Sequence, residues 1–408
     1  MEKNTLTQAK KPMKSMTYIL FTALSAGLFV TPAGGQGMEW YFESSVFQND
    51  HYLGSSIPDD QQSLGIQTGI ATFPTDQVRL TLDLSGQQVY TNTDYSQYNL
   101  WTALDWRSIA TDYSTRWRSF SGIGLGMHQY ADEFSYNNYY NLQTYFRTKY
   151  DVSKVSFFEL RYFLELKAFT ELPEASNWQH WFDLKVHQSF PTNTAVTVHL
   201  GGGVQDFISL SSLNPIQSNG RRSERVSLST GDLPTNTLGY IGFRASQSIS
   251  ARLGIYYDYK YQKRLDDNAV GAVLVLEDET SPIIDDFFWA GVQQTVGANI
   301  HLPKLTKLSV TGGFSDQDYM NVPVYAFDFE TGDFQTDVNG DKIMIENARN
   351  SQATFFQTTL TKTIQPGRNQ DLGSLDIWLQ GRYEILDGND PLYQYSGQQW
   401  VTGVTFNF

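Results

Sequence analysis

The feature that most constrains this chain is an alternation of apolar and polar residues that recurs in segment after segment. In VRLTLDLSG, residues 78–86, Val78, Leu80, Leu82 and Leu84 share one parity, and polar residues occupy the other. FFELRYFLELKAF, residues 157–169, follows the same rule with charged residues on its polar parity. Because successive side chains of a β-strand point to opposite faces, each such segment predicts a strand with one apolar and one polar face.

The connections between these segments are alternately short and long. PTD at 74–76, ATDY at 110–113, PTN at 191–193 and PKL at 303–305 are turn-like, whereas the links near 210–235 and 320–350 are long. Short turns at one end and long loops at the other are typical of outer-membrane barrels. We therefore predict an all-β fold, a transmembrane antiparallel up-and-down β-barrel of about 16 strands with short periplasmic turns and longer extracellular loops. The expected strands lie near 37–48, 62–73, 77–90, 98–109, 114–130, 139–151, 155–171, 177–190, 194–209, 236–248, 252–263, 286–301, 306–319, 351–364, 373–387 and 396–408.

The first 35 residues have the layout of a secretory signal peptide. Lys10, Lys11 and Lys14 precede the apolar run at 18–30, and the small residues of TPAGGQG follow it. The alternative is a membrane anchor, but this run is shorter than the roughly 20 residues that a spanning helix needs. We expect residues 1–35 to be a signal peptide and residues 36–408 to be an outer-membrane β-barrel, exported through the periplasm to the outer membrane of a Gram-negative cell.

Composition excludes several classes of protein. The chain has no Cys, so disulfides and thiolate metal sites are excluded, as is lipid attachment to an N-terminal cysteine. Its net charge of -14 argues against nucleic acid as a partner, because phosphates would be repelled. Phe, Trp and Tyr make up 14% of the chain, which favours β-structure. Clusters such as WQHWF at 178–182 and DDFFWA at 285–290 suggest the aromatic girdles of a membrane barrel.

The last segment, GQQWVTGVTFNF, places Trp400, Phe406 and Phe408 on one parity. A barrel must pair its last strand with its first, because an open edge in hydrocarbon leaves backbone groups unpaired. At this point the sequence resembles the bacterial outer-membrane β-barrel class (porin-like, with no subfamily motif matched). In that class the C-terminal strand alternates aromatic residues, often ends in Phe and is read by the barrel-assembly machinery. The resemblance covers the mature chain as architecture, and it implies that outer-membrane lipid and this machinery are partners; an ordinary closing strand is the alternative.

The polar parity is expected to face the lumen. A 16-stranded barrel leaves an aqueous channel, and acids and bases on this parity are nearly balanced in number. The residues that we predict to line the pore are Arg79, Asp83, Asp105, Arg107, Arg116, Arg118, Arg147, Glu159, Arg161, Glu165, Lys167, Asp183, Lys185, Arg252, Asp258, Asp376, Arg382 and Glu384. Residues paired across two neighbouring strands must point to the same side of the wall. This rule predicts two pairs of lumen-facing residues, Asp105 opposite Arg116 and Arg147 opposite Glu159.

Signals for catalysis or for cofactors are weak. His128, His187 and His199 fall on the lumen parity, where polar wall residues are the simpler interpretation than an acid–base or metal site. We expect no enzyme, no cofactor and no metal. Asp337, Asn339 and Asp341 resemble the start of a calcium loop, but Lys342 stands where Gly is expected and Ala348 where Glu is expected.

Three functions remain compatible with the sequence. The first is a porin-like outer-membrane channel for passive diffusion of small polar solutes through a charged aqueous lumen, narrowed by the loops at 210–235 and 320–350. The second is an export conduit for a surface polysaccharide, because inward aromatics such as Trp101, Trp181 and Trp378 suit sugar stacking. The third is a surface receptor or adhesin barrel that uses its acidic loops.

Overall fold

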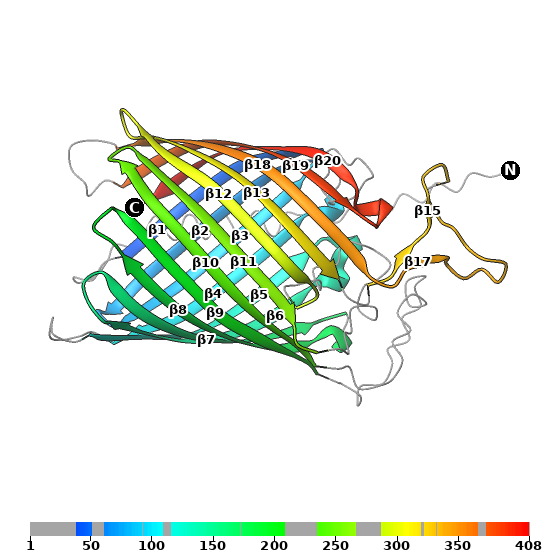
Figure 1. Ribbon diagram of the computed structural model, residues 1–408, viewed down its shortest axis with the longest axis horizontal. Coiled ribbons are helices and arrows are strands. Elements are labelled where there is room, and N and C mark those ends of the chain that lie inside the picture. Colours follow the sequence, from blue (N-terminus) through cyan, green and yellow to red (C-terminus); the bar gives the residue numbers. More distant parts are fainter. Residues whose placement is uncertain are drawn as a thin grey trace, which may run out of the picture.

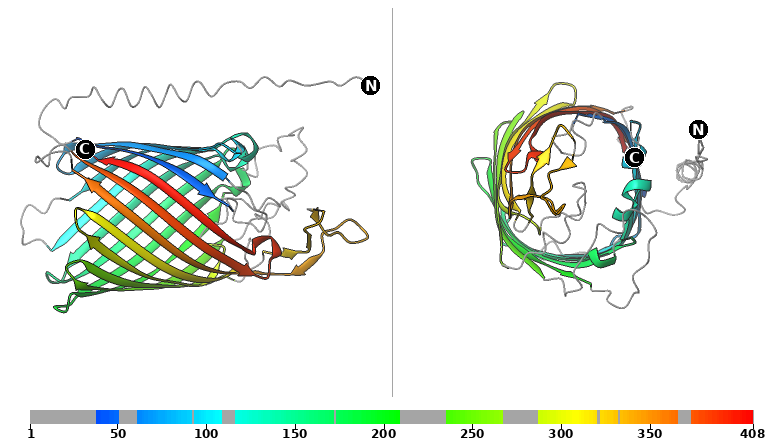
Figure 2. Two further views of the ribbon diagram at one scale, coloured as in Figure 1. Left: turned by 90° about the horizontal axis from the view of Figure 1, so that it is seen from above. Right: turned by 90° about the vertical axis from the view of Figure 1, so that its right-hand side faces the viewer.

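The computed structural model is a closed barrel of sixteen strands joined in antiparallel order. The structure describes residues 38–50, 61–91, 93–108, 116–171, 173–208, 235–266, 287–319, 322–331, 333–365 and 373–407. The predicted signal peptide and Phe408 lie outside these residues. Strands tilt across the barrel wall in Figure 1, and the end-on view of Figure 2 shows the wall as a complete ring.

All sixteen expected strands are present, and each pairs with its neighbours in sequence. Their bounds are β1 (Met38–Asn49), β2 (Gln61–Thr75), β3 (Val78–Val89), β4 (Gln97–Arg107), β5 (Trp117–Tyr130), β6 (Tyr139–Asp151), β7 (Ser156–Phe169), β8 (Asn177–Ser189), β9 (Thr194–Phe207), β10 (Asn236–Ser250), β11 (Leu253–Arg264), β12 (Ala290–Leu302), β13 (Thr306–Tyr319), β18 (Arg349–Ile364), β19 (Ser374–Gly388) and β20 (Tyr395–Asn407). The prediction of a closed up-and-down barrel is confirmed.

The barrel closes between its first and last strands. β1 pairs with β20 from Tyr41 opposite Asn407 to Asn49 opposite Gln399, so neither strand has a free edge over this length. On the outer face of this seam the rings of Trp40 and Phe406 lie 6.4 Å apart. Closure therefore supplies every strand with two neighbours, which a barrel in hydrocarbon requires.

The two ends of the barrel differ in their connections. At the end that we call the turn end, short links such as residues 76–77, 152–155, 251–252 and 303–305 join the strands. At the opposite, loop end stand the short 3-10 helices η1 (Thr93–Tyr95), η2 (Asp132–Asn137), η3 (Pro173–Ala175) and η5 (Pro391–Tyr393), with small hairpins of β14 (Val324–Tyr325), β15 (Phe327–Asp328), β16 (Asp333–Phe334) and β17 (Met344–Glu346). These hairpins extend beyond the strand ends (Figures 1 and 2). Within the described part of the chain, no helix is both long and apolar enough to cross a membrane.

The predicted register between β4 and β5 is wrong. Asp105 lies opposite Gly122 and Arg107 opposite Phe120, so the connection is longer than the tight turn that we expected. Arg116 precedes β5, and its carbonyl accepts the amide of Asp151 of β6 at 2.9 Å rather than pairing with β4. The charged side chains find partners elsewhere: Arg118 forms an ion pair with Asp151 of β6, and Arg107 Nε donates to the carbonyl of Asp76 at 2.8 Å. Charge matching across one hairpin was therefore a poor guide, because each strand has a second neighbour.

The register between β6 and β7 differs from prediction by two residues. Arg147 lies opposite Arg161, and Lys149 lies opposite Glu159. The four residues Val152 to Val155 form the turn, where the amide of Val152 bonds to the carbonyl of Ser156. Arg147 nevertheless reaches Glu159 diagonally, with its Nη2 2.6 Å from Glu159 Oε2. The predicted neighbourhood of this pair is confirmed, although the direct opposition is not.

A test of the closing seam is replacement of Phe406 by serine. The Phe406 ring covers Trp40 on the outer face, so its loss removes apolar area where the barrel must close. We expect a lower yield of assembled barrel, measured as the fraction with heat-modifiable electrophoretic mobility. Asn407→Ser, on the opposite parity, is the matched control; equal yields for both variants would contradict a role for the outer face of this seam.

Candidate functional site

The two faces of the barrel wall differ sharply in chemistry. Leu80, Leu82 and Leu104 share one parity and are exposed by more than 40%, as are many other large apolar side chains on that parity. On the other parity Glu159 is only 1% exposed. A carboxylate can be so covered only on the inner side of a closed wall, so the polar parity faces inward. A closed antiparallel barrel with an apolar outer wall and a polar inner wall is the architecture of outer-membrane β-barrel proteins.

The inner face holds most of the residues that we predicted to line a pore. By strand pairing these are Arg79, Asp83, Asp105, Arg107, Arg118, Arg147, Glu159, Arg161, Glu165, Lys167, Asp183, Lys185, Asp258, Asp376, Arg382 and Glu384. Arg116 and Arg252 lie in connections at the turn end instead. That these residues contact permeating solute stays a prediction.

The densest charge cluster lies on β6 and β7 around Glu159. Its two carboxylate oxygens accept bonds from Arg147 Nη2 at 2.6 Å and from Arg161 Nε at 2.5 Å. The carboxylate is buried beneath the two guanidinium groups, whose side chains are 39% and 45% exposed. The acid is therefore covered and the bases face the lumen. Lys149 and Lys185 flank Glu159 on the two neighbouring strands, which adds positive charge to this part of the wall.

Tyrosine hydroxyls donate hydrogen bonds to inward aspartates across an intervening strand and so hold these carboxylates in place. The Tyr145 hydroxyl donates to Asp105 Oδ1 at 2.8 Å, although β5 lies between their strands. The ring crosses β5 at Gly122, where a Cβ would clash with it. The same arrangement of tyrosine, glycine and aspartate occurs at three places on the inner wall, Tyr41–Gly69–Asp83, Tyr145–Gly122–Asp105 and Tyr240–Gly201–Asp183. Because the rings lie along the wall, they brace three strands without projecting into the lumen.

Sequence reasoning missed these tyrosines, and two arginines at the loop end. The available signal for the tyrosines was glycine at positions of polar parity, which leaves space for a neighbouring ring. Arg264 and Arg349 are inward and buried, with 4% and 5% of their residue surface exposed. Arg349 lies between the rings of Tyr319 and Tyr393, 4.3 Å and 4.1 Å from their centres.

The histidines do not form a common site. His187 bonds to Thr197 Oγ1 and Ser189 Oγ at 2.9 Å and 3.0 Å, whereas His199 Nδ1 lies 3.4 Å from Asp183 Oδ2. His128 stacks on Tyr139 with ring centres 5.1 Å apart. Among the described residues, no group of three or more His, Asp or Glu side chains is arranged to hold a metal ion.

The candidate calcium loop is the tip of a hairpin outside the barrel. Asp337 Oδ1 accepts the amides of Asn339 and Asp341 at 2.8 Å and 3.0 Å. These backbone bonds, that of Asn339 first, lower the pKa of the exposed Asp337 carboxyl. The aspartate thus stabilises its own turn, and calcium binding here stays a prediction.

One sector of the inner wall is neutral. Along β12, β13 and β18 the inward residues between the strand ends are uncharged, and Lys307 and Arg349 stand near the ends of β13 and β18. Ser309 donates to Asn299 at 2.8 Å, and Tyr256 from β11 bonds to Thr311 at 3.1 Å. A charged sector and a sector of hydroxyl and amide groups therefore lie on different strands of one ring.

Aromatic side chains pack on the inner side of the wall near the loop end. Phe287 and Phe288, which we expected in an outer girdle, are each 1% exposed and pack on the inner side. The Phe287 ring lies 4.6 Å from that of Trp181, and Lys260 Nζ lies 5.1 Å from the Trp289 ring. This segment, residues 287–289, reduces the free cross-section. Of the two loops expected to do so, residues 209–234 lie outside the described residues. The hairpins of β14 to β17 project beyond the strand ends, and in the end-on view they lie within the outline of the ring (Figure 2).

Comparisons with known proteins give structural similarities only. No protein-family model matches the chain, and no curated protein matches it in sequence. Solved structures similar to it include OccAB1 of Acinetobacter baumannii (10% identity, 91% of this chain and 96% of that chain, TM-score 0.46). They also include the outer-membrane protein OpdK of Pseudomonas aeruginosa, with 11% sequence identity over 92% of this chain and 98% of that chain and a TM-score of 0.44. A bacterial polysaccharide outer-membrane secretin is similar as well, with 10% sequence identity over 91% of this chain and 98% of that chain and a TM-score of 0.46.

Proposed function

We propose that this protein is an outer-membrane channel through which small polar solutes diffuse passively. The observation that carries the proposal is the closed sixteen-stranded wall with an apolar outer face and a charged inner face. A barrel of 16 to 18 strands is too wide for wall side chains to fill, so water occupies the lumen. Its place is the outer membrane of a Gram-negative cell, reached through the periplasm with the help of the barrel-assembly machinery.

The inner wall favours solutes that exchange hydrogen bonds with water readily. Guanidinium groups over Glu159 offer donors, and the neutral sector of β12, β13 and β18 offers hydroxyl and amide groups. Acids and bases are nearly balanced in number over the inner wall as a whole, so we expect weak selection between cations and anions, although the sector around Glu159 presents bases to the lumen. The aromatic segment at 287–289 adds apolar ring surface to the inner wall near the loop end.

Export of a surface polysaccharide is the second candidate, and one observation favours it. Inward rings such as Trp101 and Trp378 lie flat over glycines of neighbouring strands, Gly124 and Gly403, which exposes ring faces to the lumen. Sugar rings stack on such faces. Uptake of labelled oligosaccharides into proteoliposomes, compared with small amino acids of similar charge, would separate the two candidates.

Ion conduction by the purified protein tests the channel proposal. In planar bilayers we expect stable steps of conductance with a cation-to-anion permeability ratio within a fewfold of one. The reason is the mixed charge of the inner wall. A correctly folded sample, established by heat-modifiable mobility, that never conducts would contradict an open channel.

A further inference from the structure

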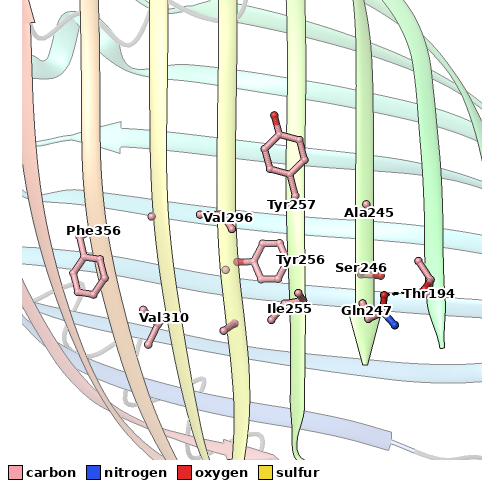
Figure 3. A pocket seen from close by; sticks show the side chains of 13 residues that line it. Thr194, Ala245, Ser246, Gln247, Ile255, Tyr256, Tyr257, Val296, Val310 and Phe356 are labelled. Carbon is pink, nitrogen blue, oxygen red and sulfur yellow. Dashed lines mark hydrogen bonds between the residues drawn. The ribbon is translucent and has the colours of Figure 1, made fainter. Parts of the chain in front are cut away.

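The outer wall is hollowed over β10 to β13 and β18. A groove of about 630 Å³ is lined there almost entirely by carbon, within the range of about 300–1,000 Å³ typical of small-molecule sites. Most of its 13 lining residues have outward parity. Figure 3 shows them spread across neighbouring strands, from Phe356 on β18 to Thr194 on β9.

Small residues between large ones create the groove. Ala245, Ala298 and Gly312 stand on the outward parity, with the rings of Tyr257 and Phe356 beside them. A Cβ placed on Gly312 would meet no atom nearer than 3.8 Å, whereas at Gly201 and Gly403 it would clash with neighbours. The space at Gly312 is therefore free for a ligand rather than taken by a packed side chain.

The groove runs between two polar boundaries. Toward the loop end, the Tyr257 hydroxyl donates to Gln294 at 3.1 Å. Toward the turn end, Gln247 accepts from the Thr194 hydroxyl and donates to the carbonyl of Thr192, both at 3.0 Å (Figure 3 shows the first). The carbon-lined part is thus separated from the turn end by groups suited to the edge of a membrane.

Basic residues stand at the turn end of the same strands. Arg252 and Lys304 are exposed in the turns after β10 and β12. Lys362 has outward parity on β18, and its ammonium donates to the backbone carbonyl of Lys304, which holds this ammonium at the turn that carries Lys304. Among the described residues of this sector, no acid has outward parity near the turn end; Asp316 and Asp318 are at the loop end. Exposed Leu302 and Leu305 complete an amphipathic rim.

We propose that this groove and rim bind an anionic phospholipid of the periplasmic leaflet, with an acyl chain in the groove and the phosphate against Arg252, Lys304 and Lys362. The proposal depends on the membrane location proposed above. It follows from charge complementarity: basic residues beside a membrane wall attract anionic headgroups, while the adjoining carbon-lined groove accepts a chain.

Native mass spectrometry of the folded, detergent-solubilised barrel tests this proposal. We expect adducts with phosphatidylglycerol at concentrations where phosphatidylcholine with the same chains binds at least tenfold more weakly. Each basic residue contributes roughly fivefold to affinity for an anionic lipid. Replacing Arg252, Lys304 and Lys362 together by glutamine should therefore remove the preference for phosphatidylglycerol. Lys154→Gln, in the exposed turn after β6, should not change it.

Filling the groove gives an independent arm. Gly312→Leu has room for its side chain and should reduce adducts of both lipids at least tenfold, whereas Ser121→Leu on the outer face of β5 should have no effect. The proposal would be overturned if the parent chain bound phosphatidylglycerol and phosphatidylcholine equally and the triple glutamine variant bound both to the same extent as the parent chain. It would also be overturned by a change of oligomeric mass in Gly312→Leu without loss of lipid, which would make the groove a contact between copies. Conductance of the same samples reports separately on the channel proposal.

Discussion

Replacing Leu82 by arginine should strongly impair insertion of the barrel into membranes. Leu82 is 42% exposed on the apolar outer face, between Ile70 and Thr102 of the neighbouring strands. Arginine on the lipid face near the bilayer centre costs about 2–4 kcal/mol, or roughly 30- to 900-fold in the folding equilibrium. The measurement is the urea midpoint of folding into phospholipid vesicles.

Thr81→Arg is the matched control, because Thr81 precedes Leu82 and faces inward beside Ala71 and Ala103. Its midpoint should stay close to that of the parent chain, since the added guanidinium remains in water. If both variants lost the same stability, the assignment of the two faces would be wrong.

The second large effect, a loss of folding stability, should come from removing the two arginines that pair with Glu159. In Arg147→Ala/Arg161→Ala, the carboxylate loses both guanidinium groups that pair with it and cover it, while it stays on the crowded inner wall. Breaking a buried ion pair from one side costs about 3–5 kcal/mol, and the exposure of the two arginines places the expected loss near the lower figure.

Glu159→Gln in the same background is the informative comparison. Neutralising the buried acid removes the unpaired charge, so the triple variant should recover most of the stability lost by the double variant. The urea midpoint again gives the measurement. A double variant as stable as the parent chain would show that Glu159 is hydrated and that the cluster does not brace the wall.

Much of this fold could be predicted from the chain because barrel strands obey one simple rule. Every strand must turn apolar residues to one side, so the parity of residues such as Leu82 and Asp83 identified the faces, and turn-like links such as residues 303–305 separated the strands. Register depended on information that parity does not hold. We matched Asp105 of β4 with Arg116, whereas in the structure Arg118 of β5 pairs with Asp151 on the opposite neighbour, β6.

The finer geometry of the lumen could not be predicted for a related reason. Contacts such as Tyr145 with Asp105 cross an intervening strand, so they depend on the tilt and curvature of the closed wall. The aromatic residues at 287–289 have the composition of an outer girdle, and only their packing against Trp181 places them inside. Composition indicates that such rings must be buried or interfacial, whereas the side of the wall is decided by the path of the loop.

The central claim is that the polar parity lines a water-filled passage, and cysteine accessibility tests it most directly. The chain contains no Cys, so Thr311→Cys and Val310→Cys would each carry a single thiol, the first facing inward and the second outward. In planar bilayers, a charged, membrane-impermeant thiol reagent should label Thr311→Cys and reduce its conductance, and leave Val310→Cys unlabelled and unchanged. Labelling of Val310→Cys with protection of Thr311→Cys, or labelling of Thr311→Cys with no change in current, would contradict the account.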